Sequence, residues 1–513
     1  MKKIHLSIVL PFIFSLSTVA QVFNILDYGA IPDNKTINTQ FIQAAVDSCA
    51  ISGGGTVYVP AGVFVTGTFG LKSNVNLFLS SGAELKGSSN IDDYKIFRAP
   101  GQIPVHYGII YTHKADNASI TGPGIINGNE EAFFKWDTPK VLEWGGARYT
   151  RQGENFRTVR EGFGDGPIEP LERPMQMIIF SECTNILVRD VQLLKSTFWT
   201  IHFSDCDGVI ISGVRIMTSL LTPNSDGIDI TSSSNVIVSD CDIRTGDDAI
   251  AITGYAYVGE LPGFHRILRA SENITITNCN LQSRSSGIRI GFIDQNTVRN
   301  IHISNVNITN SHRGIGIFTR KEGSLENITV SQVTIETRLH TGDWWGNGEP
   351  IHISAVRESP DSILGHIKNV TFRDITCYSE NGIIIYGGRD AVIEDIRFYN
   401  LRFRMLNSKM NDVGGGNIDL RGAFIEKQLF SADISAFYAQ YVERLSLDDV
   451  VIAWDNVKED YFRHGIHIVN SSKVWLTGIE AASSPSNPGL KPVMLENVKK
   501  LRIDMNKKLY TVK

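Results

Sequence analysis

Residues 273–281 read NITITNCNL, and the phrase returns as NIHISNVNI at 300–308 and as NITVSQVTI at 327–335. Each copy begins with Asn and then alternates apolar and polar residues, which is the periodicity of a β-strand. These three copies start at intervals of 27 residues. Further copies start at Asn185, Asn235 and Asn369, and weaker ones at Asn74, Asn117, Gly208 and Lys473. The recurrence indicates a repeat architecture.

A second phrase follows the first in each repeat and has the form X-G-I-X-I, with some drift. Its copies read WTIHF, DGIDI, DAIAI, SGIRI, RGIGI, EPIHI and NGIII. Two short strands and their turns in roughly 25 residues, repeated about ten times, describe the coils of a parallel β-solenoid. We therefore expect an all-β fold, a parallel β-helix of about ten or more coils. A single amphipathic segment, residues 39–48, predicts a short helix that caps the N-terminal end of the core.

The first twenty residues differ from the rest. Lys2 and Lys3 precede an apolar block at residues 4–16, and Thr18-Val19-Ala20 offers a small-residue cleavage site. This pattern predicts a signal peptide at residues 1–20 and export to the periplasm or the outside of the cell. A single β-helix domain is then expected at 21–513, with loop insertions near 130–172, 253–272, 338–350 and 404–436.

Charge and composition exclude some partners. The formal net charge is −5, and loss of Lys2 and Lys3 on cleavage would make it −7. No basic tract suits nucleic acid or an anionic membrane, and no internal stretch is long and apolar enough to span a bilayer. The sequence gives no indication of the oligomeric state.

The six Cys residues are expected to lie in the core. Cys241 and Cys279 occupy the place in the phrase that Val306 and Val333 occupy in later copies, so they are predicted to be stacked, buried thiols. Cys183 and Cys206 are a possible pair that the sequence leaves open.

Residues at one place in the repeat of a solenoid stack into a column, with neighbours about 4.8 Å apart. The residues that lead the second phrase therefore form a ladder: Trp199, Asp226, Asp248, Ser286, Arg313 and Glu349. Asp247 lies beside this ladder. Three carboxylates so close together cannot all ionise easily, so at least one pKa should be raised. A solvated polar face is the simple alternative, but folding alone gives no reason to accept this repulsion.

Hydrolysis of a glycosidic bond needs such a group of carboxylates. One acid protonates the leaving oxygen while a base activates water, and inverting enzymes place the two carboxyl functions about 6.5–9.5 Å apart. Asp226 and Asp248 are predicted to hold the water and Asp247 to act as the acid. No metal and no cofactor is called for.

Several motifs together resemble the polygalacturonases and related pectin hydrolases of glycoside hydrolase family 28. NSDGIDI at 224–230 and TGDDAIAI at 245–252 are similar to the Asn-Thr-Asp-Gly and Gly-Asp-Asp motifs of that family. GGGTVYVPAGVFVTG, GPGIINGN, RPMQMIIF and STFWTIHF extend the resemblance over most of the chain. It implies a right-handed parallel β-helix and an inverting, metal-free mechanism. It also implies that Asp247 is the general acid and that Asp226 and Asp248 hold the nucleophilic water.

The sequence departs from that family at two places. Ser286 stands where the family has His, and Gly316 and Phe318 stand where it has the Arg and Lys that grip a galacturonate carboxylate. Arg289 and Arg313 are predicted to replace that grip, because the planar fork of Arg suits a carboxylate. Alternatively, these arginines pair with acidic loop residues such as Glu349 or Asp343. The predicted substrate-binding residues are Asn224, His202, Ser286, Arg289, Arg313 and Trp345.

Long insertions around one face favour attack on chain ends, and one of Trp344 and Trp345 is expected to stack on a sugar ring. We therefore expect a secreted, exo-acting hydrolase of a pectic polysaccharide, either homogalacturonan or rhamnogalacturonan. Two other classes stay open: a β-helix lyase, in which the three Asp would bind Ca²⁺, and a non-catalytic carbohydrate-binding solenoid. The sequence leaves open which linkage is cut.

Overall fold

The structure is a computed structural model that describes residues 21–97, 104–140, 166–256, 268–340, 342, 344–424 and 428–513. The predicted signal peptide at 1–20 lies outside the described residues. Parts of the predicted insertions also lie outside them: residues 141–165, 257–267, 341, 343 and 425–427.

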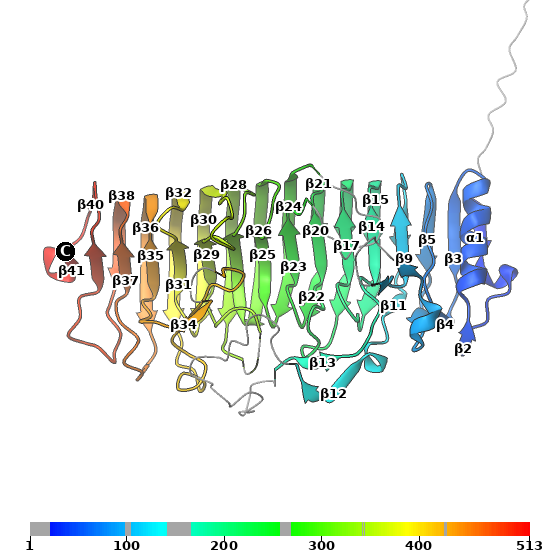
Figure 1. Ribbon diagram of the computed structural model, residues 1–513, viewed down its shortest axis with the longest axis horizontal. Helices are drawn as coiled ribbons and strands as arrows, with labels where there is room; N and C mark the ends of the chain where they lie inside the picture. The colour runs from blue at the N-terminus through cyan, green and yellow to red at the C-terminus, as the bar shows by residue number, and fades with distance from the viewer. Residues whose placement is uncertain are drawn as a thin grey trace, which may run out of the picture.

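The chain winds into an elongated solenoid whose strands stack along its long axis (Figure 1). One wall is a parallel sheet of 13 strands that follow one another in chain order. These strands carry the X-G-I-X-I phrases. They are β9 (Ile110–His113), β14 (Ile178–Ser181), β17 (Ile201–Ser204), β20 (Ile228–Thr231), β23 (Ile250–Thr253), β25 (Ser286–Phe292), β27 (Arg313–Thr319), β29 (Ile351–Ala355), β31 (Ile383–Gly387), β35 (Phe437–Gln440), β37 (Ile466–Val469), β39 (Val493–Glu496) and β41 (Tyr510–Val512).

The remaining walls belong to a second sheet of 22 strands, which carries the Asn phrases. Its long strands are β24 (Ser271–Ser283), β26 (Val298–Ser311), β28 (Leu325–Thr337), β30 (His366–Ser379), β32 (Val392–Met405), β36 (Val442–Trp454) and β38 (Ser472–Ala481). Its shorter strands are β1 (Val22–Asn24), β2 (Asp33–Ile37), β3 (Gly55–Val59), β4 (Gly62–Thr66), β5 (Val75–Leu79), β6 (Ala83–Gly87), β10 (Ser119–Thr121), β11 (Ile125–Asn127), β15 (Thr184–Arg189), β16 (Gln192–Leu194), β18 (Asp207–Ser212), β19 (Arg215–Met217), β21 (Ser234–Ser239), β22 (Asp242–Thr245) and β40 (Arg502–Ile503).

The Asn that opens each phrase makes a corner of the coil. Asn273, Asn300 and Asn327 have φ of 58°, 58° and 56°, in the left-handed region that Asn tolerates better than most residues. Their side chains also bond from coil to coil, with the amide of Asn300 donating to Asn273 at 3.1 Å and that of Asn327 donating to Asn300 at 3.1 Å. The Asn signature in the sequence therefore reflects both a backbone conformation and a side-chain ladder.

The interior is a column of apolar side chains from both sheets. Ile228, Ile250 and Ile288 follow one another in register and are each 0 % exposed. Burying one such side chain contributes about 1.5–3 kcal/mol. All six Cys are buried and free, which confirms the prediction for Cys241 and Cys279 and shows no bond between Cys183 and Cys206.

The predicted capping helix is present as α1 (Thr39–Ile51), which ends three residues later than expected. Ile42, Ala45, Val46 and Cys49 form its buried face. The helix lies at the N-terminal end of the solenoid (Figure 1). Four short 3-10 helices complete the helical content of the described residues: η1 (Ile25–Tyr28), η2 (Ile91–Asp93), η3 (Glu130–Ala132) and η4 (Lys507–Leu509).

Three antiparallel pairs interrupt the coils. They are β7 (Ile96–Phe97) with β8 (Val105–His106), β12 (Phe134–Pro139) with β13 (Ile168–Pro170), and β33 (Asn417–Asp419) with β34 (Leu429–Ser431). The β12–β13 pair and β34 project from the same side of the solenoid (Figure 1). Within the described part of the chain, no helix has the length and apolar character needed to cross a bilayer.

Candidate active site

The predicted ladder is present on the 13-stranded sheet. Ile228 pairs with Ile250 across β20 and β23, which places Asp226 and Asp248 on neighbouring coils, each two residues earlier in the chain. The backbone confirms this register, because the N–H of Gly227 donates to the carbonyl of Asp248 at 2.9 Å. Further along the ladder, Ser286 pairs directly with Arg313.

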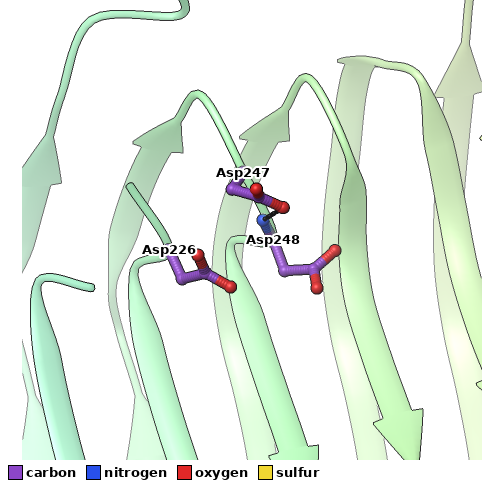
Figure 2. Close-up of side chains that lie close together, drawn as sticks. All are labelled: Asp226, Asp247 and Asp248. Carbon is purple, nitrogen blue, oxygen red and sulfur yellow. Dashed lines mark hydrogen bonds between the residues drawn. The ribbon is translucent and has the colours of Figure 1, made fainter. Parts of the chain in front are cut away.

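Asp226, Asp247 and Asp248 come together at this point, as Figure 2 shows. One carboxylate oxygen from each lies within 4.8 Å of the others, and all three residues are buried. The Asp247 carboxylate accepts hydrogen bonds from the backbone N–H of Asp248 at 3.0 Å and of Asn224 at 3.1 Å. The doublet observed in the sequence therefore directs its two side chains to different partners.

Two glycines make this close approach possible. A Cβ at Gly246, just before the doublet, would lie 2.2 Å from the carbonyl oxygen of Thr222. A Cβ at Gly227, just after Asp226, would lie 2.4 Å from the carbonyl oxygen of Ala249. Any other residue at either place would clash with the backbone of the neighbouring turn and displace the segment that carries the carboxylates.

The spacing of the carboxylates suits a single bridging water. One oxygen from each of the three residues lies within 4.8 Å of the others. One water molecule with two hydrogen bonds of about 2.8 Å at a tetrahedral angle spans about 4.6 Å. The site therefore has the dimensions to hold a water directly between two carboxylates.

The three carboxylates have different acidities. Burial, together with repulsion from Asp248, raises the pKa of Asp247 to about 6. Burial and the charge of Asp247 raise the pKa of Asp226 well above its usual range. Burial alone would raise the pKa of Asp248, but the guanidinium of Arg289 holds it below its usual value. Asp247 is thus suited to donate a proton, and Asp248 to accept one.

Arg289 forms an ion pair with Asp248. Its side chain is 13 % exposed, and it also donates to the carbonyl of Gly291 at 3.2 Å. Ala251 occupies the same column one coil earlier, on the side of the catalytic residues. The structure therefore gives Arg289 a partner within the protein, whereas the sequence predicted a sugar carboxylate as its partner.

Arg313 and Ser286 are also committed to protein contacts. Arg313 is 3 % exposed and donates to Glu349 at 2.8 Å, to Ser286 at 3.4 Å and to Asp419 at 3.4 Å. Ser286 is 0 % exposed, and its backbone N–H donates to Asp248 at 2.9 Å. For Arg313 this is the alternative outcome, pairing with Glu349, and not an exposed grip on substrate.

His202 is not placed for direct contact with a substrate. It is 0 % exposed, lies 2.9 Å from the hydroxyl of Thr231, and packs against Trp199 with ring centroids 5.1 Å apart. Burial lowers the pKa of His202 to about 3, so it is neutral, and it shares its column with Asp229, Ala251 and Arg289. Asn224 is half-buried beside Asp247, as described above.

Of the two tryptophans in the 338–350 insertion, Trp344 is 1 % exposed and packed, whereas Trp345 is half-buried. Trp345 lies under the guanidinium of Arg421 and against the ring of Phe292. Trp199, which is not among the predicted substrate-binding residues, leads the second phrase one coil before Asp226 and is half-buried.

The three Asp oxygens have the composition of a Ca²⁺ site, since hard cations prefer carboxylate ligands. The bound guanidinium of Arg289 already supplies positive charge at Asp248. A divalent cation there would be repelled by Arg289, so the residues do not fit a resident metal well.

The chain is thus a parallel β-helix with three buried carboxylates grouped beside its 13-stranded sheet. The profile of the glycosyl hydrolases family 28 matches residues 49–413, well over half of the sequence. The chain belongs to this family, and its fold is the right-handed parallel β-helix that the resemblance implied.

Individual relatives agree with this assignment. An exo-poly-alpha-D-galacturonosidase of Dickeya chrysanthemi is 30% identical over 262 residues, which are 46% of this chain and 42% of that protein. The chain spans about half the length of the curated relatives it matches. The exopolygalacturonase of Thermotoga maritima has a similar fold, with a TM-score of 0.62 at 21% identity over 84% of this chain and 92% of the other. The family 28 exopolygalacturonase of Yersinia enterocolitica gives a TM-score of 0.63 at 19% identity, over 89% and 78%.

Proposed function

We propose that this protein is an inverting glycosidase that removes units from the end of a galacturonate-containing pectic chain. Asp247 protonates the leaving oxygen. Asp248, kept ionised by Arg289, takes a proton from the attacking water, and Asp226 fixes the second hydrogen bond of that water. The observation that carries this proposal is the cluster of three buried carboxylates within 4.8 Å whose acidities diverge in opposite directions.

Pectin as the substrate rests on family membership and on the named activities of the relatives. The N-terminal segment 1–20 supports export to the periplasm or beyond, where such a polymer would be met. N-terminal sequencing of the exported protein would test that part separately.

Exo action is supported by a barrier on one side of the carboxylates. We call it the insertion wall, because it forms where the 338–350 and 404–436 insertions meet. Asp419, from the 404–436 insertion, accepts a hydrogen bond from the N–H of Gly346 at 2.7 Å and binds Arg313. Arg421 also donates to the carbonyl of Trp344. Arg313 lies two coils past Asp248 in the ladder, so this wall stands about 10 Å from the carboxylates. A polymer that extends in that direction would meet the wall after a short segment, which favours cleavage near a chain end.

A lyase is the alternative enzyme. It would need Ca²⁺ and a base that removes a proton from the sugar ring. Arg289 pairs with Asp248, and this pairing raises the pKa of the guanidinium further. Arg289 therefore stays protonated and cannot remove a proton from the sugar. This observation favours hydrolysis.

The direct test measures release of reducing ends from polygalacturonate in the presence of EDTA. A hydrolase retains its activity and gives a saturated monomer or dimer as the first product. Loss of activity with EDTA, or a product that absorbs in the near ultraviolet, would identify a lyase. Binding without product would identify the non-catalytic solenoid.

A further inference from the structure

The loop that precedes the catalytic carboxylates is held by an arginine from a different coil. Arg173 donates from Nη1 to the carbonyl oxygens of Thr197, at 2.5 Å, and Pro223, at 3.0 Å. From Nη2 it donates to the side-chain oxygen of Asn224 at 3.0 Å. One guanidinium therefore joins the turn before β17 to the turn before β20, two neighbouring turns on the catalytic side of the solenoid.

Two aromatic rings fix the plane of this guanidinium. Its central carbon lies 5.1 Å from the ring centroid of Phe134 in β12 and 5.0 Å from that of Phe198. Cation–π contacts of this kind favour Arg, whose planar fork can stack and donate several hydrogen bonds at the same time. A lysine would keep the charge but could not satisfy three acceptors in this fixed arrangement.

Asn224, the residue that Arg173 holds, is fixed at both its side chain and its backbone. It has φ of 56°, in the left-handed region that Asn tolerates better than most residues. The side chain of Asn224 is fixed by Arg173 and its N–H is fixed on Asp247 at 3.1 Å.

We propose that Arg173 is a positioning residue of the active site, which holds the turn at 223–225 so that the N–H of Asn224 stays on the carboxyl group of Asp247. This inference rests on the proposed role of Asp247 as the acid. The N–H of Asn224 lowers the pKa of Asp247 and so offsets part of the rise that burial causes. Loss of Arg173 should therefore both disorient the acid and raise its pKa.

The direction of the pH effect follows from the role of the acid. A general acid must be protonated, so activity is lost as pH rises through its pKa. This loss is the high-pH limb of the pH–rate profile. Weakening the contact between the Asn224 N–H and Asp247 should move that limb to higher pH. The charged groups around Asp247 are Asp226, Asp229, Asp248 and Arg289, and substitution of Arg173 leaves all four unchanged.

The experiment compares Arg173→Lys and Arg173→Gln with Arg215→Gln. Arg215 lies on β19 with its side chain 58% exposed and serves as the control. We expect Arg173→Lys to lower kcat by about 10- to 100-fold, the cost of a misplacement of about 1 Å. KM should change much less, and the high-pH limb should move upward. Equal rates and pH profiles for Arg173→Lys and Arg215→Gln would overturn the inference. A loss of kcat with a lower Tm and an unmoved limb would also overturn it, because it would show a purely structural role.

A second measurement does not depend on the substrate. Protein with ¹³C-labelled Asp carboxyls is titrated by NMR, and Asp247→Asn assigns the signal of Asp247. The inference predicts a higher pKa for Asp247 in Arg173→Lys than in the wild type. An identical titration would overturn it even if the wild type proved inactive on polygalacturonate, a result that would refute the proposed function separately.

Discussion

The guanidinium of Arg289 binds the carboxylate of Asp248 from the next coil, and this pair separates the roles of three adjacent carboxylates. The contact keeps Asp248 ionised, whereas its neighbour Asp247, which lies next to the same negative charge, has a pKa raised to about 6. An ionised base and a protonated acid can therefore coexist in mildly acidic conditions. Ser286 stands at the position where the related sequences have a His, and Arg289 supplies a positive charge in the same part of the site.

Replacement of the carboxylates should abolish turnover with little effect on binding. Asp247→Asn, Asp226→Asn and Asp248→Asn should each lower kcat by about 10²–10⁴-fold, because Asp247 and Asp248 transfer protons in the transition state and Asp226 holds the attacking water. The measurement is kcat on polygalacturonate, with binding of an oligogalacturonate by calorimetry as the control. A variant that keeps about a tenth of the wild-type rate, far more than that loss allows, would not have the assigned role.

Arg289→Gln should affect the base and not the recognition of acidic sugars. Without the guanidinium, the pKa of Asp248 rises, so the low-pH limb of kcat/KM should move to higher pH. Free-acid and methyl-esterified oligosaccharides should lose rate equally, and Arg289→Lys should show a smaller shift. A loss of about 10- to 100-fold on acidic substrates alone would instead show that Arg289 binds a substrate carboxylate, as a shielded charge pair would.

Stability should depend on pH through Asp247. Its folded-state pKa of about 6 lies above the ordinary value of 3.8, so the folded protein binds the proton more tightly than the unfolded chain does. The contribution of this group to the free energy of unfolding is therefore fully present below pH 3.8 and is lost as pH rises from 3.8 through about 6. Asp247→Asn should thus stabilise the protein at pH 7 by about 1–3 kcal/mol. Thermal unfolding at pH 7 and pH 4 checks this, and a Tm for the variant below that of the wild type at pH 7 would contradict it.

The position of the insertion wall should depend on the buried ion pairs that link its two insertions. Asp419 is 3 % exposed and binds both Arg313 and Arg421, so Asp419→Ala removes one ion-pair partner from each of two buried cations. Loss of one partner in a buried network costs about 3–5 kcal/mol. We expect a lower Tm and more internal cleavage of long polymers, seen as a faster fall in viscosity per bond cut. Asp433→Ala, at a residue whose side chain is 69% exposed, is the control. An unchanged Tm would show that the network does not hold the wall.

The repeat predicted the fold because each coil encodes its own strand pattern and its own Asn corner. The column of Asp226 and Asp248 followed from the spacing of the second phrase and from strand stacking, and Asp247 was placed correctly beside it. Prediction of these positions required only local periodicity and one rule about neighbouring coils.

The partners of the arginines could not be predicted in the same way. Asp419, which binds Arg313, is 106 residues away in the sequence and belongs to an insertion outside the repeat. Arg173 and Asn224 lie 51 residues apart, and the segment between them contains two full coils, β14 to β16 and β17 to β19. His202 lies in the same column as Asp229, Ala251 and Arg289, and its ring contact with Trp199 belongs to that one coil. The repeat carries no information about contacts of this kind.

Product stereochemistry tests the central claim most directly. The account assigns Asp226 and Asp248 to a water molecule and neither of them to a covalent bond with the sugar. Proton NMR of the first product released from a defined oligogalacturonate should therefore show the anomer opposite to that of the cleaved linkage, before mutarotation. Initial release of the same anomer would show that one of the carboxylates attacks the sugar itself, and would contradict the account.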